Sequence, residues 1–571
     1  MGFIDPTPPP FEYEDWRRLP HLERIKVCAQ DWALNGFGTP YFVYLLYVVK
    51  LVLYAGGGLL LISTTSGLGG LGDLGDWWTE PIVFEKAVIW TMLWEVLGLG
   101  AGSLPLTLRF SPMIGGVLYW LRPGTTRLPP WPERVPLTRG TRRTVFDVAL
   151  YAGLIAAALN LLLSDGEAVA GAAAGRLDPV AVGALLALLV LLGLRDKVPF
   201  LAARAEIYGN LAIIFLFPIT NLIVAAQLVF VCIWWGAASS KLNRHFPFVV
   251  TVMISNTPWN RWRAAKRRLY RDHPEDLRPS SIGALSAHIG TAIEFTLPLI
   301  LLVSQGGVIG TIAVAGMVIF HLHILSTFPL AVPLEWNVFM VFGLLFLFGH
   351  YGATSFSTLD DPLLLAILAV TCVGIPVLGN FRPDLISFLP SMRYYAGNWA
   401  TSQWLFRKDG AEAKLDRELV KPAAIVTEQL TKFYDPELID VLVYKGLAFR
   451  SMHSHGRALN GLVQRAVDDV EDYDVREGEL VAGVVLGYNF GDGHFHDQRL
   501  LAAIQEHCRF EPGEVRAVVL ESQPANVQRQ RYRIFDAATG LVEEGWVNVA
   551  DMVERQPWLD ERPFPVEVAS T

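Results

Sequence analysis

A lysine that follows a long apolar stretch is the residue of this sequence best suited to chemistry. Lys241 lies in WWGAASSKLNRHFP (residues 234–247), directly after a run of lipid-like sequence. A lysine at the end of a membrane helix often extends its ammonium to the headgroups, beside interfacial tryptophans. Alternatively, the small residues at 236–240 let neighbouring helices approach and desolvate the amine, and a neutral amine can act as a base. On the sequence, both an anchor and a base remain open.

Carboxylates and histidines within apolar segments are costly, so each is a candidate functional residue. Glu294 and His245 are candidates to relay or balance a proton of that lysine. Glu85 is expected to pair with Lys86 or another neighbour at the end of its helix. Glu95 lies deeper, where a functional role and internal hydrogen bonding are equally consistent with the sequence.

Three histidines of the apolar region, His288, His321 and His323, are candidates for binding a cofactor, and His350 is a fourth polar residue there. His321 and His323 are two residues apart, about 200° around a helix, so they face opposite ways. The four cysteines are widely separated, so no metal site is expected. The cofactor stays unnamed: a quinone-like lipid is consistent with the set, and haem held by separate helices is the weaker alternative.

Two histidine pairs occur nearer the C-terminus, in HSHGR (His453, His455) and GDGHFH (His494, His496). Residues i and i+2 share one face of a strand, so either pair could chelate. Because glycine and aspartate flank them, solvated loop histidines are the expected outcome. No glycine-rich phosphate-binding motif precedes a helix.

The composition predicts an all-α polytopic membrane bundle of about ten transmembrane helices. The chain has 571 residues, of which 52% are hydrophobic and only 18% charged, whereas soluble domains carry about 25% charged residues. Several apolar stretches approach the roughly 20 residues that cross a bilayer. The predicted spans are 42–63, 81–101, 146–163, 177–194, 213–236, 246–257, 283–304, 309–328, 335–351 and 363–379.

Arginine and lysine are distributed unevenly among the predicted loops. Residues 108–143 contain seven arginines and one acid, and residues 259–278 are also strongly basic. Loops at 64–80, 164–179, 304–307 and 351–362 contain one arginine and no lysine between them. Basic loops stay in the cytoplasm. Ten spans put every loop on its expected side, so both termini are predicted to be cytoplasmic in a multi-pass cell-membrane protein.

Segments on either side of the bundle have a different character. Residues 1–40 predict a cytoplasmic or interfacial segment with Trp16 and Trp32 as headgroup anchors. Residues 41–380 form the membrane domain, and 381–571 read as a small soluble α+β domain on the cytoplasmic side. There, patterns predict amphipathic helices at 414–452, a helix at 496–508, and strands at 478–489, 514–522 and 532–549, the last a hairpin.

The stretch QLVFVCIWWGAASSKLNRHF (227–246) resembles a signature of the vitamin K-dependent gamma-carboxylase superfamily, which includes the bacterial horizontally transferred transmembrane domains. IEFTLPLILLV and FHLHILSTF resemble two further family segments, in the same order, over roughly residues 205–330. The resemblance implies that Lys241, which precedes a leucine, is the base. The C-terminal region is smaller than the carboxylase's, so protein gamma-carboxylation is not expected. The whole chain also resembles an uncharacterised family of large bacterial multi-pass proteins.

Two functions from different classes therefore stay open. One is a membrane enzyme that acts on a lipid-soluble substrate, such as a quinone or isoprenoid, with a lysine base. The other is a non-enzymatic lipid-binding or transport module with a cytoplasmic docking domain. In either case the expected partners are membrane lipids, with anionic headgroups at the basic loops, and a hydrophobic small molecule. Nucleic acid is not an expected partner.

Overall fold

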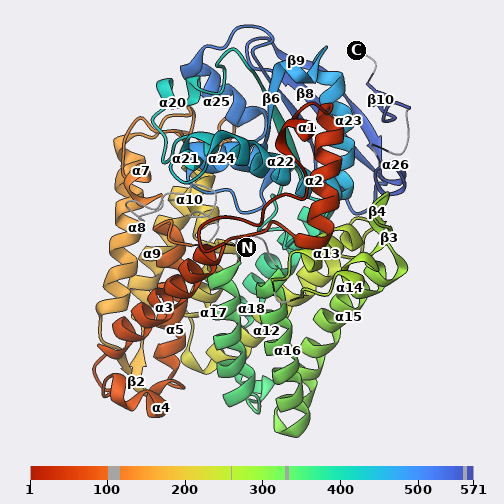
Figure 1. Cartoon of the computed structure of the whole chain (residues 1–571). Coiled ribbons are helices and arrows are strands. Elements are labelled where there is room, and N and C mark those ends of the chain that lie inside the picture. The colour runs from red at the N-terminus through yellow and green to blue at the C-terminus, as the bar shows by residue number, and fades with distance from the viewer. Residues whose placement is uncertain are drawn as a thin grey trace.

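The computed structural model describes residues 2–100, 116–258, 260–327, 333–556, 558 and 562–569. A helical bundle forms one half of the molecule, and a sheet covered by helices forms the other (Figure 1). The end of the predicted span 81–101 and part of the first basic loop lie outside the described residues.

Among the described residues, six helices are long and apolar enough to cross a membrane, which confirms a multi-pass membrane protein. Exposed leucine and valine side chains cover the outside of these helices, as lipid contact requires. The six are α3 (Tyr41–Ser63), α8 (Val145–Leu163), Ile219–Ser240 with α12 (Leu222–Ser240), α15 (Ser281–Ser304), α16 (Gly307–Thr327) and Pro362–Phe381, which ends in α19 (Ile375–Phe381).

The other predicted spans are shorter helices, so ten full crossings are not confirmed. α13 (Phe246–Ser255) has ten residues and is about 15 Å long, half the thickness of the hydrocarbon core. α5 (Pro81–Val96) is buried along almost its whole length, inside the bundle. Apolar windows cannot separate a helix buried in protein from one that crosses lipid. The remaining short helices are α9 (Pro179–Arg195), Ala205–Ile214 and Leu334–His350.

The C-terminal half is built on a six-stranded antiparallel sheet with the order β10-β9-β8-β7-β5-β6. The predicted strand at 514–522 and the predicted hairpin are confirmed, and Gly540 turns the hairpin with a φ of 87°. The strands are β5 (Thr401–Arg407), β6 (Tyr473–Glu477), β7 (Val515–Leu520), β8 (Arg529–Asp536), β9 (Gly540–Asn548) and β10 (Glu567–Val568).

One predicted strand of this half is wrong. Residues 478–489 contain α24 (Gly478–Leu486), which ends at Gly487 in the left-handed conformation (φ 82°). A short, fully buried apolar run has no amphipathic period, so the sequence could not separate helix from strand. The predicted helix at 496–508 is confirmed as α25 (Gln498–Cys508).

The N-terminal segment packs against the C-terminal half. α2 (His21–Asn35) lies along α22 (Pro436–Met452), and Lys445 Nζ lies 2.8 Å from Asp31 Oδ2. Trp16 and Trp32 are each 1% exposed, so the prediction that they anchor in headgroups is wrong: they fill a protein core. α2 and the sheet therefore lie at the same end of the bundle (Figure 1).

Candidate functional site

Lys241 and Glu294 meet inside the bundle. Lys241 follows the last residue of α12, and its Nζ donates to both carboxylate oxygens of Glu294 on α15, each at 2.6 Å. The lysine is 9% exposed and the glutamate 3%. A carboxylate at this distance stabilises the ammonium form, because charge-assisted hydrogen bonds are the strongest kind. In this arrangement Lys241 is a paired cation.

His245 points away from that pair. Its Nδ1 lies 2.6 Å from Ser454 Oγ and its Nε2 lies 2.9 Å from Gln523 Oε1, both in the C-terminal half. The ring is completely buried. Its contacts therefore join the membrane part to the C-terminal part, and none of them reaches Lys241.

The three candidate cofactor histidines do not converge. His321 is buried: its Nε2 accepts from the Trp234 indole at 3.1 Å, and its Nδ1 donates to Asn337 Oδ1 at 2.8 Å. His323 faces the opposite way and is exposed, as the spacing predicts, and His288 is exposed on α15. Within the described ranges, no three His, Cys, Asp or Glu side chains are grouped to hold a metal.

The other buried charges of the bundle are held by protein groups. Glu85 accepts from the Leu177 amide at 2.7 Å, so its partner is a neighbour and not Lys86. Lys86 instead donates to the Thr65 hydroxyl and to two backbone carbonyls. Glu95 is buried. The four histidines of HSHGR and GDGHFH are also buried, so their prediction as solvated loop residues is wrong.

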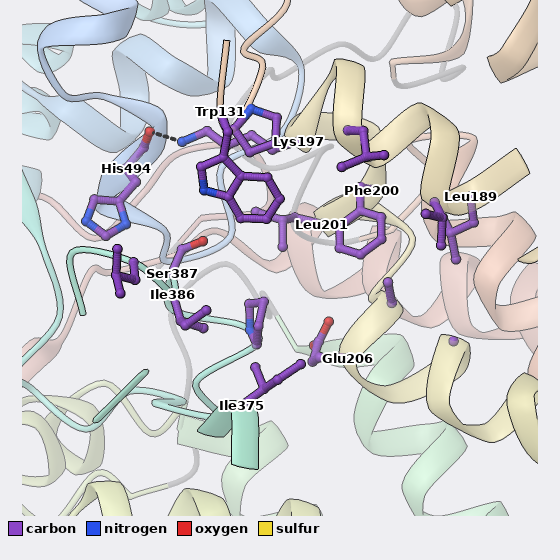
Figure 2. Close-up of a pocket in the computed structure, with 18 of the residues that line it drawn as sticks. Trp131, Leu189, Lys197, Phe200, Leu201, Glu206, Ile375, Ile386, Ser387 and His494 are labelled. Carbon is purple, nitrogen blue, oxygen red and sulfur yellow. Dashed lines mark hydrogen bonds between the residues drawn. The ribbon is translucent and has the colours of Figure 1, made fainter. Parts of the chain in front are cut away.

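A cavity of about 740 Å³ lies where the bundle meets the C-terminal half (Figure 2). Its walls come from α9, α10 (Lys197–Ala202), the segment Ala205–Ile214, α19 and the stretches 130–134 and 384–390. Most of the wall is apolar. Among the lining residues, Val190 is 53% exposed on the outside of α9, so this wall reaches the lipid-facing surface.

Positive charge gathers at one end of this cavity. Lys197, Arg134, Arg499 and His494 all line it. Lys197 is 6% exposed, and its Nζ donates to the backbone carbonyl of His494 (Figure 2). In the described part of the chain, no carboxylate oxygen lies within 4.0 Å of this ammonium. Lys197 is a buried cation without an acidic partner.

The carboxylates that line the cavity are each paired with an arginine. Glu206 Oε1 lies 2.7 Å from Arg204 Nε. Asp384 Oδ2 lies 2.6 Å from Arg382 Nη2, and Glu133 Oε2 lies 2.9 Å from Arg139 Nη2. Two of the basic lining residues are balanced as well, since Arg499 Nη2 lies 3.0 Å from Asp497 Oδ2 and His494 Nε2 lies 2.7 Å from Glu521 Oε1. In the described part of the chain, Lys197 and Arg134 are the basic lining residues with no carboxylate oxygen within 4.0 Å, so an anion is favoured beside them.

Burial and neighbouring charges shift the titration of the polar end. Burial lowers the pKa of Lys197 to about 8, and Arg499 acts in the same direction. Burial also acts to lower the pKa of His494, but Glu521, with Oε1 2.7 Å from Nε2, raises it above its usual value. Burial opposes ionisation of Glu521, yet His494 holds the pKa of this carboxyl at about 2. Asp497, Asp492 and Asp196 act to raise the pKa of Lys197 but do not outweigh burial, and a pKa of about 8 leaves this lysine mostly protonated at neutral pH.

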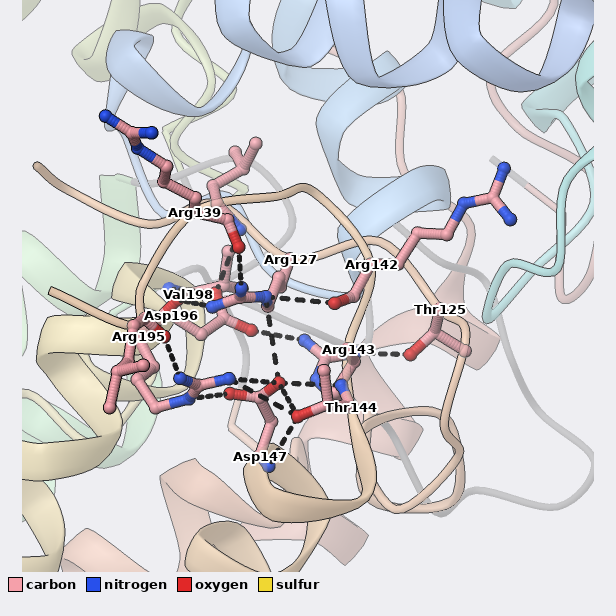
Figure 3. A network of polar contacts seen from close by, with 12 residues as sticks. Thr125, Arg127, Arg139, Arg142, Arg143, Thr144, Asp147, Arg195, Asp196 and Val198 are labelled. Atoms are coloured by element: carbon pink, nitrogen blue, oxygen red, sulfur yellow. Dashed lines mark hydrogen bonds and ion pairs between the residues drawn. The ribbon is translucent and has the colours of Figure 1, made fainter. Parts of the chain in front are cut away.

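A network of arginines and aspartates fixes the loop over the cavity (Figure 3). Arg143 pairs with Asp196 and donates to the Thr125 hydroxyl at 2.6 Å. Arg127 donates to the carbonyls of residues 139, 142 and 195, and Arg195 pairs with Asp147. These contacts tie the ends of α8 and α9 to the loop that carries Trp131, a residue of the cavity rim. Two of the arginines predicted to mark the cytoplasmic side are thus buried structural residues.

The backbone beside the cavity is irregular. Ala205–Gly209 is a π-helical turn, and Arg204 before it has a φ of 49° in the left-handed region. Such conformations cost about 1–3 kcal/mol for a residue other than glycine and cluster at functional sites. The Arg204 guanidinium is held by Glu206 and lies over the ring of Trp336, 5.3 Å from its centroid. The turn places Ala205 and Gly209 in the cavity wall.

The comparisons with known proteins agree with the membrane fold. A family model described as a transmembrane protein of unknown function (DUF3556) matches residues 1–569. The chain belongs to this family. No curated protein and no solved structure matches the chain. Membership of DUF3556 supports a multi-pass membrane protein, and the resemblance to the gamma-carboxylases remains a hypothesis.

Sequence reasoning missed Lys197 and Arg499 at the polar end of the cavity. Lys197 lies in RDKVPFLAAR, where a charged, proline-containing stretch interrupts two apolar segments. That interruption was a usable signal, because polar residues beside a broken membrane helix often line a binding site. Arg499 gave no such signal, since it lies about 300 residues away in the chain. His494 was noted in the sequence as one of a possible chelating pair, but nothing there linked it to Lys197.

Proposed function

We propose that this DUF3556 protein binds an amphiphile, with an apolar chain along the cavity wall and an anionic head beside Lys197. The observation that carries the proposal is the buried ammonium of Lys197, which has no carboxylate within 4.0 Å among the described residues and borders an apolar cavity. Leaving a charge unpaired in a buried place is costly, so such a group commonly has a ligand. The volume lies in the usual range of about 300–1,000 Å³ for small-molecule sites.

Entry from the bilayer fits the position of the cavity. Its outer wall is formed by α9, whose exposed face includes Val190. A molecule with a long apolar chain partitions into the membrane and reaches this wall without crossing water. The cationic end lies toward the C-terminal half, at the level where the head of such a molecule would sit.

A substitution that fills the cavity tests this proposal. The added Cβ of a side chain at Gly209 would lie 3.6 Å from Ala205 and 3.7 Å from Leu189, both wall residues. Gly209→Phe should therefore abolish binding of a fluorescent long-chain fatty acid to the purified protein in detergent. Gly183→Phe is the control: it also lies in the bundle, with its nearest contact at 3.8 Å from Leu216, and does not line the cavity. Equal binding by both variants would reject the proposal.

A second candidate function is proton chemistry at Lys241, as in the enzyme hypothesis. The contact between Lys241 and Glu294 favours it, because a paired acid can take up the ammonium proton when a substrate displaces the pair. Lys241→Ala should then abolish turnover in a complementation assay. Lys241→Arg should fail equally, since arginine does not deprotonate. Full function of Lys241→Arg would leave this lysine a structural cation.

The orientation of the protein belongs to the same proposal. Residues 381–571 and both termini would lie in the cytoplasm, with 41–380 as the membrane domain. Two features support this: the arginine-rich loops, and the position of α2 and the sheet at one end of the bundle. Reporter fusions after Arg143, Arg268 and Thr571 should read cytoplasmic, and those after Gly72 and Ser357 external. An external signal at Thr571 would overturn the orientation.

A further inference from the structure

Two hollows on another side of the bundle share part of their lining. The first, the headgroup pocket, has a volume of about 220 Å³ and is lined by the N-terminal segment and by residues 256–258, 260, 261, 263 and 266. The second, the chain groove, has a volume of about 610 Å³ and lies between α3 and α16. Thr39, Tyr44, Asn256 and Pro258 line both. A molecule can therefore extend from one into the other.

The headgroup pocket carries positive charge only. Arg261, Arg263 and Lys266 line it, and no aspartate or glutamate does. The Arg261 guanidinium donates to the Tyr41 hydroxyl at 3.2 Å, and Lys266 Nζ donates to the Ser255 carbonyl at 2.7 Å. Among the described residues, no carboxylate oxygen lies within 4.0 Å of any of these three cations. Phosphate oxygens are the natural complement of two arginines and a lysine.

The chain groove has the character of a lipid contact. Val48 on α3 is 56% exposed, and Ile319 and Leu322 on α16 are 67% and 55% exposed. Both helices are long and apolar enough to span a membrane. The groove therefore faces the bilayer, and it shares lining residues with the basic pocket, which is also lined by Leu34 and Asn35 of α2.

We infer that the headgroup pocket and the chain groove together form a site for one anionic glycerophospholipid, with its phosphate at Arg261 and Arg263 and an acyl chain between α3 and α16. This site is independent of the cavity beside Lys197. Its lining joins four parts of the chain: the N-terminal segment, α3, the loop at 256–266 and α16. A bound phospholipid would hold the N-terminal segment against the bundle, which couples the packing of α2 to the charge of the surrounding leaflet.

The test measures binding of a fluorescent phosphatidylglycerol to the full-length protein in zwitterionic detergent, with fluorescent phosphatidylcholine and inorganic phosphate as comparison probes. Replacing Arg261 and Arg263 together with glutamine should weaken phosphatidylglycerol binding roughly 30-fold, since each basic residue contributes about a factor of five at a membrane surface. The control replaces Arg267 and Arg268, which are exposed on the same loop, carry the same charge and do not line the pocket. The control should bind like the original protein.

A second pair of variants examines the chain groove. Val48→Trp fills it, whereas Val52→Trp adds the same side chain one turn along α3, at a residue 66% exposed and outside the lining. Only Val48→Trp should weaken binding of phosphatidylglycerol. An equal loss of phosphatidylglycerol binding in both double-arginine variants would mean that the lipid is attracted by the overall positive charge of this surface and not by the pocket. That result would overturn the proposal. Competition by inorganic phosphate together with full binding by Val48→Trp would reduce the site to a phosphate pocket and would also overturn it.

Discussion

Two buried lysines in this protein have opposite surroundings. Lys241 lies within the bundle and donates to both oxygens of Glu294. Lys197 borders the large cavity and donates to a backbone carbonyl, with no carboxylate within 4.0 Å among the described residues. The two side chains are similarly buried, at 9% and 6% exposure. Burial alone therefore does not identify a binding lysine: the presence or absence of a counter-charge does.

This difference separates structural charge from available charge. The pair of Lys241 and Glu294 is neutral overall, so it can remain buried without a ligand. The ammonium of Lys197 gains most from an incoming anion, because the acidic groups that act on it, Asp497, Asp492 and Asp196, all lie beyond 4.0 Å. The four predictions below test this contrast.

Removal of the counter-charge should have the largest effect. Glu294→Ala leaves Lys241 buried and unpaired, which should lower the free energy of unfolding by about 3–5 kcal/mol. Thermal unfolding in detergent measures the loss. The double variant Lys241→Met, Glu294→Leu should recover most of it, because neither charge remains. A single variant that unfolds at the original temperature would show that the pair is not structurally important.

Removal of the unpaired lysine should affect binding and not stability. Lys197→Met should weaken binding of the fluorescent fatty acid by about 1.5–3 kcal/mol, the contribution of a hydrogen bond to a charged group. The melting temperature of the unliganded protein should not fall, because the substitution removes a buried charge that has no acidic partner within 4.0 Å. The free-energy cost of burying that charge is removed with it. A large drop in melting temperature with unchanged binding would reverse the roles assigned to the two lysines.

The pH dependence of binding should follow Lys197. Its pKa of about 8 lies below the usual value of 10.5, so the anion loses its cationic partner as pH rises through about 8 and affinity falls. The stability of the unliganded protein depends on pH with the opposite sign. Between about pH 8 and pH 10.5 the unfolded chain binds more protons than the folded protein, so the free energy of unfolding rises with pH.

Lys197→Arg is the control for this titration, because arginine stays charged. It should retain affinity above pH 8 and flatten the profile. His494, whose pKa is raised, also loses its proton as pH rises. Only the part of the pH dependence of affinity that Lys197→Arg removes therefore belongs to Lys197. An unchanged slope in this variant would assign the titration to another group.

The exposed rim should contribute least. Arg134→Gln should weaken fatty-acid binding by at most about 1 kcal/mol, and less at high salt, because exposed charges are well screened. Arg142→Gln removes the same charge from an exposed residue of the same loop that does not line the cavity. A larger effect at Arg142 than at Arg134 would show that binding does not occur at this rim.

Local patterns explain how much of the fold could be predicted. Helices such as α3 and α16 are long, apolar and lipid-facing, so hydropathy identifies them. Strand β7 is a short apolar run rich in valine, and the hairpin of β8 and β9 combines the period-two pattern of β8 with a glycine turn. Segments buried on every side, such as α5 and α24, carry no periodic signal. The sequence therefore could not tell whether α5 is a membrane-crossing helix or a core helix, or whether the residues of α24 form a helix or a strand.

By itself, the sequence determined that the chain crosses a membrane several times, that it carries a folded α+β half, and that Lys241 and Glu294 are noteworthy residues of the apolar region. These conclusions depend on composition and spacing, which are local. Only the tertiary structure decided that Lys241 is paired while Lys197 lacks a carboxylate among the described residues. It also brought His494 and Arg499 to the cavity from about 300 residues away. The electrostatic role of a buried charge depends on its neighbours in space, and their distances are not encoded in any single segment.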